Sequence, residues 1–418
     1  MANILQPQDA YVLINAIAKQ ATGRADLAAV DTSTFVSVGE HVIRTGYENT
    51  LNAISEVLSR TIFSSRPYTS RLMSLRVSES AWGNRIRKIM FLSKDAEASQ
   101  NWNTNLSPNQ LADGQSIDMY TINAPEAVEL NFYGVKTLQR HITRFYRQLQ
   151  VAFLNERELM GFINGFMTEF YNDIETDNED ITRLLIINQI AGIANMALPG
   201  FVDLIAQFNL ERGTTLTREE ILRDHFTAFM QFMVAEIKTI SDRMQDRSAL
   251  YHANLTGYKP ILRHTNKSLQ KMILYAPFFN KAEASVFSSI FNPGFLSLGR
   301  NFDTVNYWQA QESPTSITAT PNILDVATGA SKTGTEQTIP YVLGILFDRD
   351  FMGVQPRFDH ALTTPVNAAG DYYNIYYHWA FNAYGDFTEN AFVFVLGNGG
   401  APVESDLRTR SAIGKVDK

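Results

Sequence analysis

The chain has 418 residues, 45% of them hydrophobic and 11% aromatic, which predicts two or three compact units and excludes a disordered chain. Its formal net charge of -7 argues against a protein that coats nucleic acid, because such binding depends on Lys and Arg neutralising phosphates. It contains no cysteine, which excludes disulfides, thiolate metal sites and cysteine nucleophiles.

Two further features of the sequence indicate where the protein is made and whether partners cover its surface. The first residues, MANILQPQDAYVLINAIAKQ, lack a basic segment followed by an apolar core of signal-peptide length, and no apolar run approaches the roughly 18 residues that span a bilayer. We therefore expect synthesis in the cytoplasm and no contact with a membrane. Charged residues make up only 19% of the chain, which suits a surface that partners cover.

Residues 1–60 alternate amphipathic helical stretches with extended ones. Apolar residues recur there every three or four positions in two groups. These are Tyr11, Ile14 and Ile17, and then Ile43, Tyr47, Leu51, Ile54 and Leu58. The second group predicts a helix. The whole stretch fits an arm that lies over a neighbouring molecule, and it fits an ordinary helical hairpin equally well.

A long polar stretch separates two predicted strands. Residues 85–92 (RIRKIMFL) and 128–135 (VELNFYGV) have strand patterns, and the roughly 35 residues between them hold few apolar side chains. We expect a long hairpin that serves as an arm. The cationic side chains of Arg85, Arg87 and Lys88 mark either a solvated strand edge or a contact with another subunit.

A long helix is predicted over 155–173. Asn155 can cap it, with Glu158 three positions later, and one apolar face follows. That face consists of Leu159, Phe162, Ile163, Phe166, Met167 and Phe170. The acidic run from Asp173 to Asp180 predicts a solvated joint, after which a second helix continues through Leu184, Ile187, Ala191 and Ala194.

Residues 136–147 interleave basic and apolar side chains. The basic members are Lys136, Arg140, His141, Arg144 and Arg147. This pattern suits a track for nucleic-acid phosphates, and it suits Arg pairs with carboxylates of a neighbouring subunit. We favour the second interpretation, with the acidic run as one candidate partner. The candidate inter-subunit contacts are Arg85, Arg87, Lys88, Lys136, Arg140, Arg144, Arg147, Asp173, Glu175 and Asp177.

The remainder of the chain predicts one more helix and then a sheet. Thr217 and Glu220 form a capping-box pattern that opens a helix to about Gln245. Apolar strands follow, and their continuous hydrophobicity indicates a sheet covered on both faces. They are KMILYA, FDTVNYW, YVLGILF (341–347), YYNIYYHWAF (372–381) and AFVFVL (391–396). Residues 313–340 are expected to form a surface loop or insertion, and 397–418 a flexible tail.

Motifs for catalysis or cofactor binding are missing from the sequence. The seven histidines show no metal-binding spacing, and His378 is expected to be a hydrogen-bonded core residue. The acidic run lacks the glycine and closing glutamate of a calcium loop, and Gly397–Gly400 is not followed by a phosphate-binding helix. We expect neither an enzyme nor a cofactor, although serine or carboxylate catalysis could arise from residues distant in sequence.

The order of these segments resembles the major capsid proteins of small short-tailed bacteriophages of the phi29-like group, which have the HK97-type capsid fold. Residues 153–196 resemble that family's spine helix, acidic joint and second helix, and YVLGILFDRDFMG (341–353) resembles its apolar strand closed by acidic residues. DYYNIYYHWAF (371–381) and ENAFVFVL (389–396) are similar to its aromatic and final strands. The resemblance covers 130–396.

The resemblance implies an α+β fold with five regions. These are an N-terminal arm (1–70), an extended E-loop hairpin with its flanks (71–135), a peripheral domain (136–215) with spine helix 155–173 that the C-terminal strands complete, an axial domain (216–396) with the insertion 313–340, and a tail (397–418). The chain would then be a structural subunit of the virion that assembles with itself as hexamers and pentamers. A scaffolding protein and a portal would be partners, and packaged double-stranded DNA would be contacted weakly from inside. The insertion departs from the family pattern, and we see no appended immunoglobulin-like domain.

Three other hypotheses stay open at this point. An encapsulin-like compartment would share the fold and enclose proteins. An enzyme with a dispersed active site would be a monomer with a deep polar pocket. A portal or tail protein would be a different structural component of a phage.

Overall fold

A computed structural model describes residues 7–22, 68–77, 85–92, 126–145, 156–281 and 302–399, together with isolated positions at 29, 34, 37, 38, 42, 114, 116, 119, 120, 122 and 124. The chain divides into two compact units, each built from three separate stretches. Unit 1 comprises residues 1–84, 133–185 and 353–384. Unit 2 comprises residues 85–132, 186–352 and 385–418.

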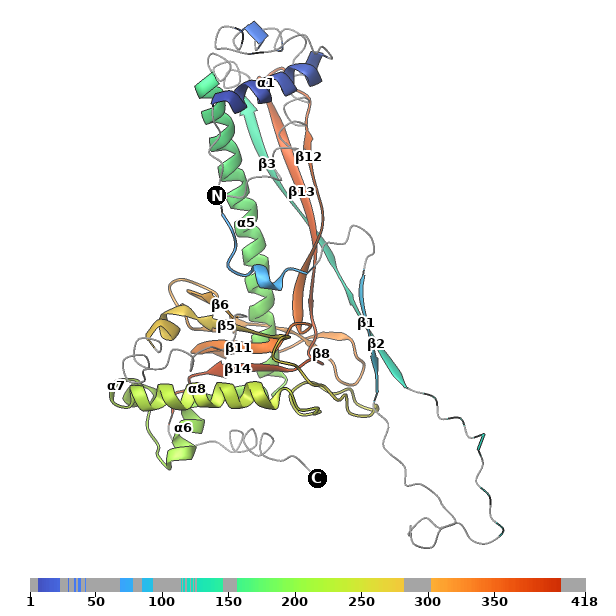
Figure 1. The fold of residues 1–418 in the computed structure, drawn as a ribbon, viewed down its shortest axis with the longest axis vertical. Helices are drawn as coiled ribbons and strands as arrows, with labels where there is room; N and C mark the ends of the chain where they lie inside the picture. The colour runs from blue at the N-terminus through green and yellow to red at the C-terminus, as the bar shows by residue number, and fades with distance from the viewer. Residues whose placement is uncertain are drawn as a thin grey trace. The chain divides into compact units, whose positions relative to one another are not determined.

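Unit 1 is built on a three-stranded sheet in the order β12-β13-β3, with a long helix along it (Figure 1). The strands are β12 (Met352–Thr363), β13 (Tyr372–Gly385) and β3 (Val135–Phe145), and the helix is the first part of α5 (Glu156–Asn195). The unit also holds α1 (Pro7–Thr22) and the short 3-10 helix η1 (Met73–Leu75). In α1 the predicted apolar face is confirmed, since Ile14 and Ile17 are buried.

Alternation along β13 decides which side chains meet α5. Tyr377 and Trp379 are buried against Phe170 and Ile174 of the helix, and the Tyr377 and Phe170 rings meet edge to face at 5.7 Å. Successive side chains of a strand point to opposite faces. The even-numbered residues of β13 therefore face away from α5, and among them His378 is only half-buried.

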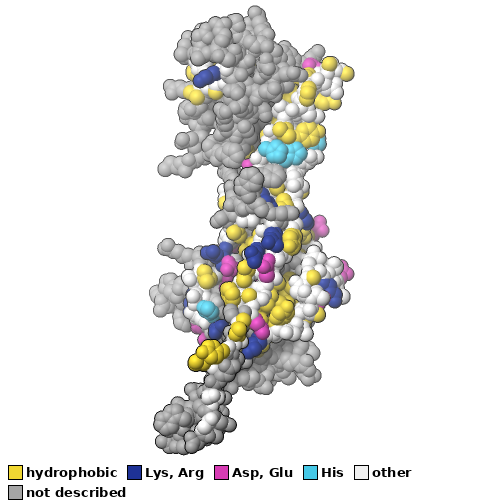
Figure 2. Space-filling view, turned by 90° about the vertical axis from the view of Figure 1, so that its right-hand side faces the viewer, with side chains coloured by type: hydrophobic (Ala, Val, Ile, Leu, Met, Phe, Trp, Pro, Cys, Tyr) yellow, Lys and Arg dark blue, Asp and Glu magenta, His cyan; other side chains and the backbone are white. Residues whose placement is uncertain are grey.

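That outward face carries a stack of aromatic and imidazole rings. Tyr376 lies 5.1 Å from His141 and 6.3 Å from His378, which in turn stacks on His360 at 5.2 Å. Figure 2 shows histidine side chains grouped on the surface. The expectation of a core histidine at 378 is wrong because the strand pairing turns this position away from the helix.

Unit 2 is built on a five-stranded sheet in the order β4-β14-β11-β5-β6. The strands are β4 (Phe201–Asp203), β14 (Ala391–Val395), β11 (Val342–Asp348), β5 (Gln270–Tyr275) and β6 (Phe302–Val305). β11 pairs antiparallel with β14 and β5, while β4 and β6 run parallel to their neighbours. Every residue of β11 and β14 is buried, which confirms a sheet covered on both faces for the predicted strands 341–347 and 391–396. The strand predicted at 372–381 was expected in the same sheet, and it belongs instead to β13 in the separate sheet of unit 1.

Three helices of unit 2 follow the first edge strand, namely α6 (Leu204–Arg212), α7 (Arg218–Asp224) and α8 (Phe226–Arg243). The capping box at the start of α7 is confirmed, with the Thr217 and Glu220 side chains each bonded to the other's backbone. The single helix expected to about Gln245 is wrong. It is interrupted at His225, whose φ of -121° and ψ of 20° are not helical, a change that apolar spacing does not register.

The predicted hairpin strands are confirmed as β1 (Arg85–Phe91) and β2 (Ala127–Tyr133), which form a two-stranded sheet. One face of this sheet is buried in a small apolar cluster within unit 2. The cluster consists of Met90, Leu92, Val128, Leu130, Leu255 and Ile261. The base of the hairpin is thereby fixed to the body of unit 2.

The stretch 313–340 is not a plain loop. It contains β7 (Ile317–Ala319) paired with β10 (Gln337–Ile339), and β8 (Asn322–Leu324) paired with β9 (Ser331–Thr333). These strands are short and rich in Ser and Thr, so no apolar pattern marked them in the sequence. Among the described residues of the four strands, only Ile317 and Ile339 are buried apolar residues.

The glycines after β14 are ordered, which contradicts their interpretation as part of a flexible tail. The Gly397 N–H donates to Asp203 Oδ1 at 3.0 Å, and Gly399, with a φ of +78°, forms a β-bridge with Thr217. A side chain at 397 would collide with the Asp203 carboxylate, so glycine is needed for this close approach. Residues 400–418 lie outside the described residues.

The acidic joint expected between two helices is also wrong, because α5 is one helix of 40 residues. Cations from elsewhere in unit 1 pair with its acidic side chains, as described below. The predicted cap Asn155 and the predicted helix around 43–58 lie outside the described residues. Among the described residues, no helix combines the length and the hydropathy needed to span a bilayer.

Candidate functional site

The described residues hold no group of three or more His, Cys, Asp and Glu side chains arranged to bind a metal ion. Their polar side chains instead gather in two structural networks. One lies at the base of the hairpin in unit 2, and the other lies along α5 in unit 1.

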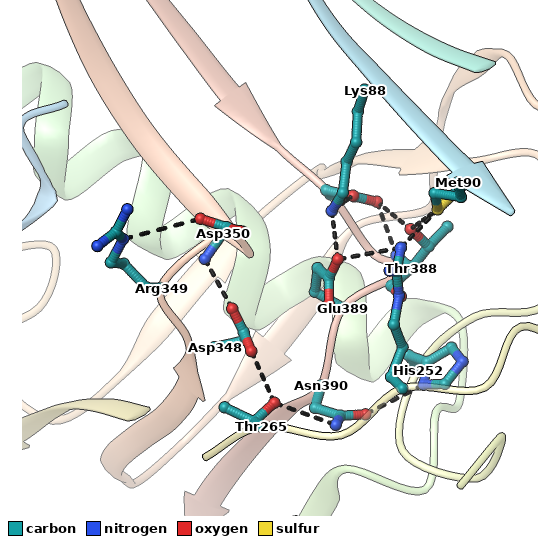
Figure 3. A network of polar contacts seen from close by, with 12 residues as sticks. Lys88, Met90, His252, Thr265, Asp348, Arg349, Asp350, Thr388, Glu389 and Asn390 are labelled. Carbon is teal, nitrogen blue, oxygen red and sulfur yellow. Dashed lines mark hydrogen bonds and ion pairs between the residues drawn. The ribbon is translucent and has the colours of Figure 1, made fainter. Parts of the chain in front are cut away.

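The first network holds β1 to the turn between β13 and β14 (Figure 3). Lys88 Nζ donates to Asp386 Oδ2 at 2.5 Å and also to Glu389 Oε1. Both carboxylates are buried, with side chains 2% and 8% exposed, while the Lys88 side chain is 21% exposed. We call Lys88, Asp386, Thr388 and Glu389 the hairpin anchor.

Neighbouring groups complete the hairpin anchor. Asp386 Oδ1 accepts hydrogen bonds from the Thr388 N–H at 2.8 Å and the Thr388 hydroxyl at 2.7 Å. Arg263 Nη2 lies 3.0 Å from Glu389 Oε1, and its Nε donates to the Thr388 carbonyl. Burial raises the pKa of Glu389 above its ordinary value, even though Lys88 and Arg263 both act to lower it.

A second row of polar groups lies behind the hairpin anchor. Asn390 joins His252 to Thr265, and Thr265 donates to Asp348 Oδ2 at 2.7 Å. The His252 ring is 3% exposed, and its Nε2 lies 2.8 Å from the Ile261 carbonyl oxygen. Burial lowers the pKa of His252, so the neutral ring is the stable form at neutral pH.

The second network begins at Arg140 on β3. Its guanidinium contacts both carboxylate oxygens of Asp177, at 2.5 and 2.8 Å, and Asp173 at 2.8 Å. The hydrogen bond with Asp177 raises the pKa of Arg140. A shallow hollow of about 470 Å³ borders this contact and is lined by Leu138, Gln139, Arg140, Asp177, Asp180, Ile181 and Trp379.

The same network continues on another side of α5. Glu175 accepts from Arg76 at 2.7 Å and from the Ser70 N–H at 3.1 Å. Glu179 accepts from the Tyr68 hydroxyl at 2.8 Å and from Arg183 at 2.7 Å. Burial acts to raise the pKa of Glu179, and these hydrogen bonds outweigh it, so the net shift is downward. Four of the helix's acidic side chains are thus paired within the chain.

The predicted contact residues can now be placed. Arg87 pairs with Glu129 of β2 at 2.8 Å, and Arg85 lies 4.0 Å from the same carboxylate. Lys136 is exposed on β3, and Arg144 lies opposite Tyr373 in the sheet. Arg147 lies outside the described residues. The partners seen for Lys88, Arg140, Asp173, Glu175 and Asp177 are in the same chain, so their contacts with other subunits stay a prediction.

Sequence reasoning missed Arg76, Arg263, Asp386 and Glu389. The segment Asp386–Asn390 (DFTEN) reads as an exposed turn between two apolar strands, yet all five residues are buried. The only available signal was the density of hydrogen-bonding side chains in a turn this short.

Comparisons with known proteins identify the family. Residues 14–395 match the family model of the Phi29-like phage major capsid protein. No curated protein matches the chain. Among solved structures, a chain of native bacteriophage P68, in a structure of its head fiber and inner core protein gp22, has a TM-score of 0.51 and 9% identity over 78% of this chain and 84% of that chain. This likeness shows a shared fold.

Two other similar structures come from phage capsids. A chain in the capsid structure of Staphylococcus phage Andhra has a TM-score of 0.48 and 9% identity over 80% of this chain and 89% of that chain. A chain in the capsid asymmetric unit of cyanophage Pam1 has a TM-score of 0.41 and 9% identity over 79% of this chain and 93% of that chain.

The family match covers nearly the whole chain, and it sets aside the enzymatic, encapsulin-like, portal and tail hypotheses. The expected α+β fold of the phage-capsid type is confirmed. The chain belongs to the Phi29-like phage major capsid protein family, and it is a non-enzymatic structural component of the virion that forms the phage head.

Proposed function

We propose that the chain assembles with copies of itself as hexamers and pentamers that close an icosahedral head around double-stranded DNA. In this proposal the β1–β2 hairpin is the arm with which each subunit holds its neighbour. The observation that carries it is the exposure of apolar side chains on this hairpin. Met119, Tyr120 and Ile122 are 80%, 80% and 89% exposed.

The strands of the hairpin add to this apolar surface. Along β1 the odd-numbered side chains face outward, and Phe91 is 75% exposed while Met90 beside it is buried. Covering one such side chain stabilises a contact by about 1.5–3 kcal/mol. Several of them on one arm suffice for a contact that becomes cooperative when many subunits close a shell.

The regional assignments expected from the sequence form part of the proposal. They are the arm (1–70), the hairpin and its flanks (71–135), the peripheral domain (136–215), the axial domain (216–396) and the tail (397–418), of which Gly397 and Gly399 are held in the ordered part of the chain. The confirmed hairpin strands and the length of α5, which suits a spine helix, support them.

The proposed partners are a scaffolding protein, a portal and packaged DNA. A net charge of -7 favours only weak contact with DNA at the inner surface, because phosphates repel an acidic protein. Among the candidate contacts between subunits, the side chains of Arg85, Arg87 and Lys136 are exposed at the surface.

Deletion of residues 94–124 tests the role of the hairpin. A short Gly-Ser linker would replace them, and the protein would be produced together with its scaffolding protein. We expect circular dichroism and thermal unfolding close to those of the full chain, and no closed shells in velocity sedimentation or electron microscopy. Shells of normal size would contradict the proposal, and loss of folding would show that the deleted segment belongs to the core.

A further inference from the structure

The hairpin anchor brings together the three groups needed to form an amide bond between side chains. Lys88 supplies an amine, Asp386 a carboxyl group, and Glu389 a second carboxyl group that contacts the same Nζ. Figure 3 shows Lys88 directed toward the Glu389 carboxylate. The amine lies within hydrogen-bonding distance of Asp386 Oδ2, at 2.5 Å. We propose that Lys88 and Asp386 form an intramolecular isopeptide bond, made by the chain itself, that joins β1 to the turn before β14.

The two oxygens of Asp386 are held in different environments, and this favours the reaction. Oδ1 accepts the Thr388 N–H and the Thr388 hydroxyl, so two donors are already directed at the oxygen on which negative charge develops during attack. Oδ2 faces the amine and becomes the leaving group. The carboxyl carbon is thereby polarised in the direction that an approaching nitrogen needs.

Burial keeps the reacting groups away from water. Asp386 and Glu389 are almost completely covered, so hydration stabilises charge there less than it does at the protein surface. Burial also raises the pKa of Glu389, so this group takes up a proton more readily than an exposed glutamate. Arg263 acts to lower the pKa of Glu389, and it stabilises the negative charge that remains on the network.

The reaction is balanced without any added reagent. Lys88 passes one proton to Asp386 Oδ2, and its free amine attacks the Asp386 carboxyl carbon. Glu389 accepts a second proton from the attacking nitrogen and delivers it to Oδ2, which leaves as water. The products are an amide between Lys88 Nζ and Asp386 Cγ, one water molecule and an unchanged Glu389. Fixed proximity replaces the activation that a separate enzyme would otherwise provide.

Such a bond would hold the base of the hairpin permanently. The ion pair of Lys88 with Asp386 can open and re-form, whereas an amide is a covalent bond. In a chain without cysteine it would take the place of a disulfide at the base of the hairpin.

The intact mass of the purified full chain, measured under denaturing conditions, tests the proposal. We expect a mass one water molecule below the sequence mass, in free subunits or after assembly into shells. Tryptic digestion should then give one branched peptide that contains both Lys88 and Asp386. A measured mass equal to the full sequence mass, in both free and assembled protein, would overturn the proposal and leave the network as ion pairs only.

Three variants separate this bond from dehydration elsewhere. Lys88→Arg keeps the cation and lacks the reactive amine, so its mass should equal its sequence mass. Glu389→Gln lacks the proton carrier and should form the bond at least tenfold more slowly. The control Lys136→Arg, at an exposed lysine of β3, should lose water as the original chain does. A water loss that persists in Lys88→Arg would arise at another residue and would overturn the assignment.

Discussion

Arg140 binds both carboxylate oxygens of Asp177, through Nε at 2.5 Å and Nη2 at 2.8 Å. Its third nitrogen reaches Asp173, one helical turn earlier, at 2.8 Å. One side chain of β3 therefore bridges two acids on the same face of α5 and offsets part of their negative charge. Repulsion between those acids would otherwise destabilise the middle of the helix, and the pairing explains why α5 continues through the acidic run.

Replacing Arg140 by Met should destabilise unit 1. The side chain is 35% exposed, so water screens part of the interaction, and we expect a loss of about 1 kcal/mol in the free energy of unfolding. Urea titration followed by circular dichroism would measure it. The control is Arg223→Ala, which removes a well-exposed pair with the adjacent Asp224 and should change stability negligibly. Equal losses in both variants would refute the special role of Arg140.

The capping box of α7 gives a second prediction. Thr217 accepts the Glu220 N–H at 3.3 Å, and replacing it by Ala should cost about 1 kcal/mol because a backbone donor at the helix start loses its partner. Thr239→Ala is the matched control, since that hydroxyl only bonds the Ala235 carbonyl within its own helix. Thermal unfolding would measure the loss of stability in each variant. Equal losses in the two variants would contradict the capping role.

His252 gives a prediction about pH. Its pKa in the folded chain is lowered by burial from an ordinary value of 6.5, so below that pH the unfolded chain binds a proton that the folded chain does not. Stability should therefore fall as the pH drops from 6.5 toward the lowered pKa. The slope of melting temperature against pH, measured from pH 7.5 to 5, should be smaller for His252→Gln. An unchanged slope would exclude His252 as its source.

Replacing Gly200 or Gly213 by Ala should destabilise the fold, and the physical reason differs between the two positions. A Cβ at Gly200 would lie 2.0 Å from the Ala391 carbonyl oxygen, which is backbone and cannot move aside, so a loss near or above 3 kcal/mol is expected. Gly213 has open space around it and a φ of +65°, so only the left-handed conformation opposes a side chain, at about 1–2 kcal/mol. Denaturant unfolding should rank Gly200→Ala as clearly worse, and the reverse order would contradict the packing seen at β14.

Much of the fold could be predicted from sequence because the relevant signals are local. β11 and β14 are short apolar runs, and their complete burial agrees with the expected sheet. The α5 joint was predicted wrongly because the cations that pair with its acids lie far away in the chain. Arg76 is 99 residues from Glu175, and no local pattern links them.

The hairpin anchor could not be predicted for the same reason. Lys88 is separated from Asp386 by 298 residues, and only the folded chain brings them together. The sequence presented Lys88 as part of a solvated strand edge or of a contact with another subunit, and it offered no partner within the chain. The structure provides partners in the same chain, so Lys88 fixes the base of the hairpin.

Assembly of a double variant, Met119→Ser with Ile122→Ser, tests the central claim most directly. Both side chains are exposed on the hairpin, so the fold should be unaffected, and Ser116→Ala, at an exposed polar position of the same segment, is the control. Each protein would be produced with the scaffolding protein and examined by velocity sedimentation and electron microscopy. We predict closed shells for the control and unassembled, folded subunits for the double variant. Shells of normal size and yield from the double variant would contradict the account.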